Sequence, residues 1–321
     1  MSAKVSIGMP VYNGALTLEA TIQTILNQKF SDFELIISDD CSKDNTQEIC
    51  EKFQKLDSRI KYFRQDENFG MPVKNFQFVL DKAEGEFFMF ASHDDPYHPE
   101  FIESMLEVME FDKKCIIAFS DYSIANASGN EKILITPSSS CSKSKVARYL
   151  SRIIDFQPAL IYGLFRKKYF TSNDLKLFDF FEVSLGLRMA IKGNIRIVNK
   201  DLWSWNIDGQ RKSHSIYPLG FYLRDLLGLK RKKKKVLVDH AAQSNRRFSE
   251  TQMEDKFMNY LPFYFSQLKL IFKSFSLLKS LIISIPLTYY VLGKIVYLFI
   301  KPRGMDIDFD DPENIPKYHD D

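Results

Sequence analysis

Cysteine is scarce in this chain of 321 residues, which contains four: Cys41, Cys50, Cys115 and Cys141. Their spacings include no C-x-x-C pair, and no paired histidine tract accompanies them. The sequence therefore argues against a zinc site and against a disulfide framework, and it favours a reducing, cytosolic setting.

Long hydrophobic runs are also absent. The two longest uncharged apolar stretches are Phe257–Leu268 and Ser280–Gly293, and the second has 14 residues, whereas a helix needs about 20 to span a bilayer. Residues 1–4 lead directly into a strand-like segment without an apolar leader, so we predict no signal peptide. The composition is otherwise near the globular average, which excludes disordered and coiled-coil classes.

The net charge of +3 conceals two segments of opposite sign. Residues 211–303 hold 18 Lys and Arg against 5 Asp and Glu, a local charge of +13, and the rest of the chain carries −10. This basic segment also contains both apolar stretches. The mixture is typical of helices that lie in a membrane interface with lysines reaching anionic headgroups.

We therefore divide the chain into a first domain (1–215), a helical basic and apolar region (216–303) and an acidic tail (304–321). We expect the middle region to bind an anionic membrane surface from the cytoplasmic face as a peripheral protein. A helical packing subdomain or a homodimer interface is the alternative. The lysine run 230–235 fits a membrane surface, a solvated loop or an RNA-binding patch equally well.

Short apolar runs alternate with helix-period stretches through the first 125 residues. This alternation predicts parallel pairing in a doubly wound α/β sheet. The expected strands are 5–10, 33–38, 60–64, 87–91 and 115–120, and the expected helices are 16–28, 45–56, 73–83 and 100–111. Further on, 146–154, 181–192 and 222–229 are predicted helices and 195–198 a short strand, with a polar break at 138–144.

Polar residues follow these strands, at the edge where such sheets bind ligands. Tyr12, after the first strand, could stack on a flat base or cap the core, and Asn13-Gly14 permits a turn with positive φ. An aspartate after the second strand, at Asp39-Asp40, can accept hydrogen bonds from a ribose or base.

The third and fourth strand ends carry a lysine and two carboxylates. Lys74 lies in a predicted first helical turn, where it could face a diphosphate or remain a solvated surface charge. His93, Asp94 and Asp95 follow the fourth strand. A phosphate and one or two carboxylates suffice to hold Mg²⁺, whereas a charged turn before a helix explains Asp95 alone.

These segments together resemble the family-2 glycosyltransferases of GT-A fold. The resemblance rests on Val5–Asn13, Ile36–Asp44 and Gly85–Asp95 in the family's order and spacing, and it covers roughly the first 215 residues. It implies an α/β fold with a mainly parallel sheet flanked by helices, followed here by a helical, basic and apolar C-terminal extension. It also implies sugar transfer with inversion from a nucleotide-diphosphate donor (a UDP-, GDP- or dTDP-sugar), with Mg²⁺ or Mn²⁺ as cofactor.

The resemblance assigns the nucleotide to residues after the first three strands. They are Pro10, Tyr12, Asn13, Asp39, Asn68 and Lys74, with Asp94 of the fourth strand end completing the set. Lys74 stands where the family usually has arginine. The family's Asp-x-Asp metal motif falls on Ser92-His93-Asp94, which leaves Asp94 as the chief metal ligand, with His214 as a second.

The general base and the sugar pocket are assigned in the same way. The family takes its base from an acidic pair before a helix, and Asp179–Arg188 occupies that place, so Glu182 is the expected base and Asp179 the reserve. Without the resemblance, both would be interpreted as charges favoured at a helix N-terminus. The expected acceptor and sugar pocket contains His93, Asp95, Tyr162 and Trp205.

We therefore predict an enzyme that glycosylates a hydroxyl of a glycan or lipid-linked acceptor. Ser92 and Phe181, which replace acidic residues of the family pattern, leave open an inactive nucleotide-sugar-binding paralogue that serves as a scaffold. A nucleic-acid partner is not expected, because no aromatic stacking residues accompany the lysine run and the first two thirds are acidic.

Overall fold

The computed structural model describes residues 2–126, 132–155, 157–175 and 181–207, with 268, 271–273, 280 and 284; of 125–126, 132–133, 153–154, 181–183 and 207 it describes the backbone alone. The chain divides into two compact units, Met1–Leu223 and Arg224–Asp321. The predicted boundaries at 215/216 and 303/304 and the predicted helix 222–229 lie outside the described residues. Within that described part, no helix is long and apolar enough to cross a membrane.

The first unit begins with alternating strands and helices, as the sequence predicts. The strands are β1 (Val5–Val11), β2 (Phe33–Asp39), β3 (Ile60–Arg64) and β4 (Phe87–Phe90), and the helices are α1 (Leu18–Leu26), α2 (Thr46–Leu56), α3 (Pro72–Lys82) and α4 (Phe101–Phe111). The strands are apolar because β1, β2 and β4 are covered on both faces, as parallel strands require.

The second half of the unit is less regular. It contains β5 (Cys115–Asn126), β6 (Lys132–Ile135), α5 (Lys145–Ile154), β7 (Leu164–Arg166), α6 (Phe181–Lys192) and β8 (Asn194–Ile207). Three short 3₁₀ helices, η1 (Pro158–Tyr162), η2 (Lys167–Tyr169) and η3 (Ser172–Asp174), connect these elements.

All eight strands form one sheet in the order β3-β2-β1-β4-β7-β5-β6, and β8 pairs with β5. β1 to β4 are parallel, whereas β7 runs antiparallel to both β4 and β5, and β6 runs antiparallel to β5. The expected parallel pairing therefore holds for β1 to β4, and the two antiparallel strands, β6 and β7, are strands that the sequence did not predict. β7 follows α5 and η1 in the chain and is inserted between β4 and β5 with the opposite direction.

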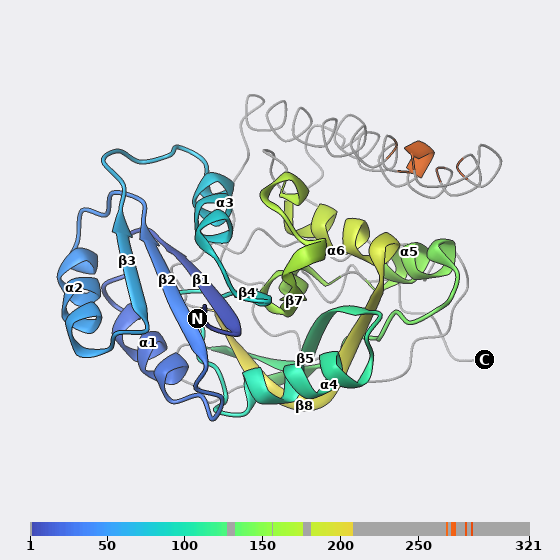
Figure 1. Cartoon of the computed structure of the whole chain (residues 1–321), viewed down its shortest axis with the longest axis horizontal. Coiled ribbons are helices and arrows are strands. Elements are labelled where there is room, and N and C mark those ends of the chain that lie inside the picture. Colours follow the sequence, from blue (N-terminus) through green and yellow to red (C-terminus); the bar gives the residue numbers. More distant parts are fainter. Residues whose placement is uncertain are drawn as a thin grey trace, which may run out of the picture. The chain divides into compact units, whose positions relative to one another are not determined.

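Figure 1 shows α1, α2 and α4 on one side of the sheet and α3, α5 and α6 on the other. The core lies between these layers and is rich in aromatic side chains, including Phe88, Phe90, Phe165 and Phe170. The rings of Phe165 and Phe170 stack at 4.4 Å between centroids, and Phe88 meets Phe90 edge-on at 4.7 Å. This packing fixes β4 and β7 in the centre of the sheet, so the residues that follow β4 project from a rigid element.

Candidate active site

The carboxyl ends of β1 and β2 carry two loops that are joined by hydrogen bonds. The Asn13 amide donates to Ser42 Oγ at 2.8 Å, and Asn13 Oδ1 accepts from the Lys43 amide at 2.9 Å. Asn13 has φ of 51°, which asparagine tolerates better than most residues. Its side chain is thus used to hold the second loop, and this contact accounts for Asn13 without a nucleotide.

Gly14 and Asp44 complete the connection between the two loops. The Gly14 amide donates to Thr46 Oγ1 at 2.9 Å and the Ala15 amide to Asp44 Oδ2 at 3.0 Å. A Cβ on Gly14 would lie 2.8 Å from Cδ2 of His93, so glycine allows the His93 ring to lie against the first loop. The ends of β1, β2 and β4 therefore form one pre-organised edge.

The two adjacent aspartates after β2 have different environments. Asp39 is fully buried, and its carboxylate accepts hydrogen bonds from Arg64 Nη1 at 2.7 Å, Tyr62 OH at 3.0 Å and the Ser42 amide at 2.8 Å. Both oxygens are therefore engaged by protein groups. The structure gives Asp39, which we predicted to bind the nucleotide, a role in holding β3 and the second loop.

Asp40 is the aspartate that sequence reasoning passed over. Its Oδ1 accepts from the Phe69 amide at 2.7 Å, and burial raises the pKa of this carboxyl, with Asp39 adding to the effect and Phe69 and the Lys74 charge opposing it. Lys74, exposed in the first turn of α3, is thus close enough to influence Asp40. A carboxylate and an ammonium group side by side offer both acceptor and donor to a nucleotide.

The remaining residues predicted for the nucleotide have distinct positions. Asn68 donates to the Asp40 carbonyl at 3.0 Å and accepts from the Gly70 amide at 2.8 Å, so it shapes the loop before α3. Pro10 lies within β1 in register with Ser38. Tyr12 is 45% exposed at the edge, which leaves its ring available to stack.

The segment after β4 turns sharply and is held by β8. Ser92 Oγ donates to Asp94 Oδ1, and the side chain of Asn206 donates to the Asp94 carbonyl at 3.0 Å. The Asn206 amide donates to Asp95 Oδ1 at 2.9 Å. Asp95 is therefore a buried residue that ties this turn to β8, and Asn206 is a positioning residue that the sequence did not single out.

An aromatic cluster lies beside this turn. Trp203 of β8 is buried, with the Tyr162 ring at 5.2 Å, Trp205 at 6.5 Å and Tyr97 at 6.5 Å. Tyr162 and Trp205, which we predicted for the sugar pocket, are only partly buried and are brought together through Trp203. Tyr162 is the last residue of η1, directly before β7.

The candidate base lies at the start of α6. Glu182 is the second residue of this helix, while its side chain, Asp179 and His214 lie outside what the structure describes. The helix itself is firmly placed at its other end, because Arg148 donates to the carbonyls of Ala190 at 2.7 Å and Ile191 at 3.1 Å. These contacts satisfy the carbonyls that a helix C-terminus leaves open.

The residues after β4 can be tested against the metal that the family pattern implies. Among the described residues no group of three or more His, Cys, Asp or Glu side chains could hold a metal ion, and Asp94 shares one oxygen with Ser92. Mg²⁺ is often held by one or two carboxylates, substrate phosphates and several waters. Asp94 fits an ion of this kind, brought mostly by the diphosphate, and does not fit a preformed protein cage.

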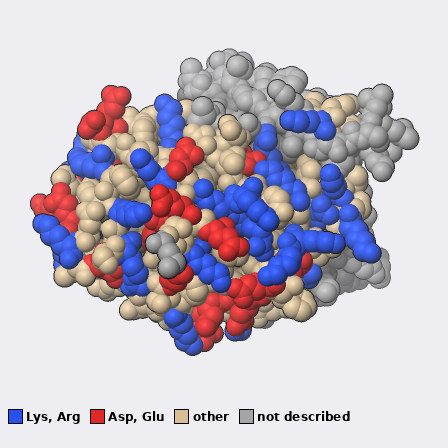
Figure 2. Space-filling view, in the orientation of Figure 1, with Lys and Arg blue, Asp and Glu red and all other residues tan. Residues whose placement is uncertain are grey.

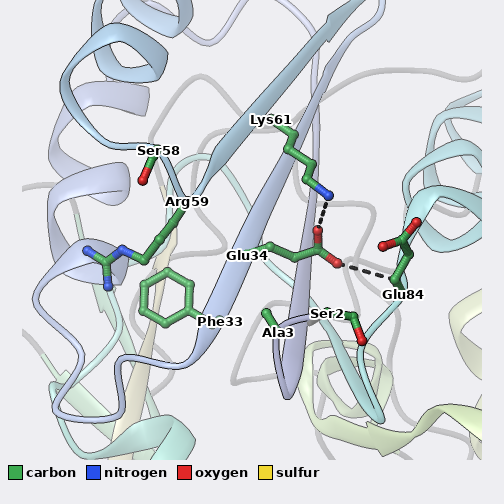
Figure 3. Close-up of a pocket in the computed structure, with 8 residues that line it drawn as sticks. All are labelled: Ser2, Ala3, Phe33, Glu34, Ser58, Arg59, Lys61 and Glu84. Carbon is green, nitrogen blue, oxygen red and sulfur yellow. Dashed lines mark hydrogen bonds and ion pairs between the residues drawn. The ribbon is translucent and has the colours of Figure 1, made fainter.

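A pocket of about 470 Å³ opens at the opposite edge of the sheet, beside the amino ends of β1 and β2 (Figure 3). Two of its charged residues form an ion pair: Glu34 pairs with Lys61 at 2.7 Å and also accepts from the Glu84 backbone amide at 3.2 Å. Burial raises the pKa of Glu34, but these hydrogen bonds outweigh it and lower the pKa overall. Arg59 covers the Phe33 ring at 4.4 Å. This pocket does not contain the predicted site residues.

A polar edge of this kind, at the carboxyl ends of parallel strands, is typical of the nucleotide-binding α/β proteins. Comparison with family models shows more: residues 6–173 match the glycosyl transferase family 2 model, which is over half of the chain. The chain belongs to this family.

Individual relatives support the assignment. The chain is 33% identical over 137 residues to a Bacillus subtilis protein named provisionally as the teichuronic acid biosynthesis glycosyltransferase TuaG, covering 42% of this chain and 54% of the relative. It is 42% identical over 92 residues to a Campylobacter jejuni GalNAc(5)-diNAcBac-PP-undecaprenol beta-1,3-glucosyltransferase, covering 29% of this chain and 30% of the relative. The matches thus span about half or less of these curated relatives.

Among solved structures, Staphylococcus aureus TarS 1–349 in complex with UDP-GlcNAc aligns with a TM-score of 0.58 over 91% of this chain and 72% of that one. The sequence identity is 20%, so this likeness establishes the fold. The fold prediction is thereby confirmed as GT-A; the C-terminal extension lies outside the described residues.

Proposed function

We propose that the protein transfers a sugar from a nucleotide-diphosphate donor to a hydroxyl of a glycan or lipid-linked acceptor, with inversion at the anomeric carbon. The observation that carries this proposal is the pre-organised edge at the ends of β1, β2 and β4, with Tyr12, Asp40 and Lys74 on one side and Asp94 on the other. A UDP donor is supported by the nucleotide sugar bound to TarS, and a lipid-linked acceptor by the name of the Campylobacter relative.

In this proposal each part of the edge has one task. Tyr12 stacks on the base, while Asp40 accepts a hydrogen bond from the base or ribose and Lys74 meets the diphosphate. Asp94 would hold Mg²⁺ or Mn²⁺, which supplies compensation for the charge of the leaving diphosphate. Tyr162, Trp205 and His93 border the sugar, and Asp95 keeps the turn in place through Asn206.

Glu182 is the proposed general base. A single base that removes the acceptor proton as the hydroxyl attacks is what an inverting transfer requires, and such a group contributes about 10²–10⁴-fold to the rate. Glu182 lies in the first turn of α6, and α6 packs against η1, which carries Tyr162 of the proposed sugar pocket. Asp179 is the reserve candidate.

The test is a panel of nucleotide sugars with Mg²⁺ or Mn²⁺ and lipid-linked or glycan acceptors, followed by release of nucleoside diphosphate. We expect Glu182→Gln to retain donor binding and to lower kcat about 10³-fold, and Asp94→Asn to weaken metal-dependent donor binding. Asp179→Asn is the matched control for loss of an acid near the helix start. Turnover by Glu182→Gln together with its loss in Asp179→Asn would exchange the two roles.

A second candidate is favoured by the Ser92 contact. Because Ser92 replaces the first acid of the metal motif and its hydroxyl binds Asp94, the protein could bind a nucleotide sugar without transferring it, as a scaffold in glycan assembly. The scaffold function would be supported if the protein binds a nucleotide sugar but turns it over with none of the acceptors. Glu182→Gln should then leave donor binding unchanged.

For residues 216–303 we propose peripheral docking on an anionic membrane at the cytoplasmic face, based on the local charge counted over 211–303 and on the two apolar stretches. A homodimer interface is the competing function of this segment. Sedimentation of the full chain over a concentration series, with and without anionic vesicles, separates the two: a dimer formed without lipid and no vesicle binding would reject the membrane proposal.

A further inference from the structure

Half of the residues that line a hollow of about 770 Å³ in the first unit are cations. We call it the basic groove and define it by Lys113, Lys114, Lys143, Arg148 and Arg196. The lysines belong to the loops before β5 and before α5, Arg148 to α5 and Arg196 to β8. Three segments that are distant in sequence thus bring five cations to one surface.

The acid in the lining of the groove is already neutralised. Asp112 accepts from Arg196 Nε at 2.8 Å, from Asn194 Nδ2 at 2.9 Å and from the Lys114 amide at 2.9 Å. Burial opposes ionisation, but these hydrogen bonds lower the pKa of Asp112 overall. Asp112 is therefore ionised at neutral pH and is matched by Arg196, and the other four cations form no ion pair with it. Lys113 also attracts the Glu110 carboxylate, whose pKa is lowered mainly by Lys4 and further by Lys113.

The three lysines have no carboxylate partner within the described part of the chain. Neighbouring lysines do: Lys4 pairs with Glu110 at 2.7 Å and Lys192 with Asp174 at 2.7 Å. No such pair is formed by Lys113, Lys114 or Lys143, and all three are exposed. Figure 2 shows the wider setting: acidic and basic side chains are interspersed over much of the visible face, whereas the α5 side is mainly basic.

Arg148 adds a fixed charge within the lining. It is buried, and its guanidinium donates to carbonyls only, those of Ala190, Ile191 and Ser142 among them. Burial lowers its pKa, but a guanidinium stays protonated in proteins. An anion at the groove therefore meets one immobile cation and three mobile ones.

A large apolar side chain stands at the rim. Phe111, the last residue of α4, is 90% exposed and is followed by Asp112, Lys113 and Lys114. An exposed ring next to unpaired lysines combines apolar insertion with attraction to anionic headgroups. A single ring of this kind does not provide the succession of stacking platforms that single-stranded nucleic acids use.

The groove lies at the edge of the sheet opposite the candidate active site. β5 is antiparallel to β7 and β7 is antiparallel to β4, so β5 runs in the same direction as β4. Lys113 and Lys114 precede β5 and Arg196 lies near the start of β8, where Cys115 pairs with Asn194, so this part of the groove lies at the amino edge. Seven-residue β1 spans about 20 Å between the two edges.

We propose that the basic groove and Phe111 form a docking surface for anionic phospholipid headgroups of a bilayer. The surface belongs to the first unit and shares no residue with the basic segment 211–303. A further consequence, which rests on the proposed function, is that the reactive hydroxyl lies about 20 Å or more from the headgroups. Such a distance suits a lipid-linked acceptor that already carries several sugars.

The test is vesicle binding by the full chain without donor or acceptor, so that its outcome is independent of catalysis. The triple variant Lys113→Gln, Lys114→Gln, Lys143→Gln is compared with wild type on phosphatidylglycerol-containing vesicles. We expect its partition coefficient to fall about 100-fold, because each lysine near an anionic surface contributes independently. Phe111→Ser should lower binding about tenfold, and neither variant should change the thermal midpoint.

Matched variants elsewhere on the first unit serve as controls. The triple variant Lys55→Gln, Lys82→Gln, Lys168→Gln removes the same charge from exposed lysines outside the groove, and Leu56→Ser removes another exposed apolar side chain. Equal losses in the groove and control variants would overturn the proposal, because they would reflect net charge alone. Equal binding to vesicles of phosphatidylcholine alone would overturn it as well.

Two competitors identify the source of the anion. If the groove needs a bilayer into which Phe111 inserts, excess inorganic phosphate should not release the protein from vesicles. Release by phosphate alone would show that the groove binds free anions, and this result would overturn the proposal. Groove-dependent binding to single-stranded RNA without binding to vesicles would overturn it in favour of a nucleic acid.

Discussion

The two halves of the first unit differ in the buried charges that bind their backbone: carboxylates accept from amides in both halves, whereas buried arginines that donate to carbonyls belong to the second half. In the half built from β1 to β4, carboxylates accept from backbone amides: Asp39 from Ser42, Asp40 from Phe69 and Asp44 from Ala15. In the half built from β5 to β8, arginines donate to backbone carbonyls. Arg148 binds those of Ala190 and Ile191, Arg152 that of Ser138, and Arg166 that of Met109.

This difference changes how the acidic residues of the site are interpreted. A carboxylate that follows a buried strand has fewer acceptor positions left for a ligand when the fold already uses some of them. Asp39 accepts three hydrogen bonds from protein groups and Asp40 accepts one from the Phe69 amide, although the two are neighbours in sequence. The buried arginines of the second half, Arg148, Arg152 and Arg166, also bind the fold, and the sequence pattern did not single them out because no motif contains them.

The largest expected effect on stability comes from Asp39→Ala. Removing this buried carboxylate leaves Tyr62, Arg64 and the Ser42 amide without their acceptor. We expect a loss of about 3 kcal/mol in the free energy of unfolding, measured by urea denaturation. Unchanged stability with lost nucleotide binding would return Asp39 to the ligand role that the sequence predicted.

In the second half, Arg148→Met should cost about 2 kcal/mol of stability. The variant keeps much of the side-chain volume but removes the donors to the last carbonyls of α6. Arg196→Met, which removes a partly exposed arginine from the same groove, is the control and should cost less than about 1 kcal/mol. Equal effects of the two variants would contradict the proposed distinction between a buried and a surface arginine.

The third prediction separates ligand binding from folding at Asp40. Asp40→Asn keeps an oxygen for the Phe69 amide but removes the charge, so nucleoside diphosphate binding should weaken about tenfold. Because burial raises the pKa of Asp40, its ionised form destabilises the fold at neutral pH, and the variant should be as stable as wild type or more so.

The pH dependence of this comparison has a definite sign. The stability advantage of Asp40→Asn should be present above the folded pKa of Asp40 and disappear as the pH falls below the ordinary aspartate value. Calorimetric titration with UDP and urea denaturation at pH 7 and pH 3 give the two readouts. A large loss of stability at pH 7 would show that Asp40, like Asp39, serves the fold.

Much of the first half could be predicted from the sequence, because its strands and helices follow apolar runs and helical periods. β3 begins and ends as expected, and β1, β2 and α2 differ by one residue at one end. The second half could not, for two physical reasons. β7 has three residues, too few to show a period, and β8 extends to Ile207, far beyond the expected 198, through a polar segment whose register shifts against β5.

The site shows the same division. The strand ends identified the edge and the acidic residues on it, but choosing between Asp39 and Asp40 requires the register of β2 and β3. Asp39 pairs with Arg64 in that register, and this pairing determines which carboxylate is neutralised. The sequence does contain a signal for this pairing, because Arg64 is the last residue of the third predicted strand. The hydrogen bonds from Asn206 to Asp94 and Asp95 require β8 to lie beside the turn after β4. Because these segments are distant in sequence, no local sequence pattern predicts the contact.

The smallest expected effect tests the acid of the second half. Asp112 accepts from Asn194 and Arg196, and its pKa is lowered overall although burial opposes this, so its ionised form stabilises the fold. A lowered pKa contributes stability above the ordinary value for aspartate, and that contribution is lost as the pH falls through the folded pKa. Because Arg196 is partly exposed, solvent screens the pair, and Asp112→Asn should cost only about 0.5–1 kcal/mol at pH 7. In urea denaturation this difference should shrink toward pH 3; a difference that grows on acidification would mean that Asp112 acts in the fold as a neutral hydrogen-bonding group and does not balance Arg196.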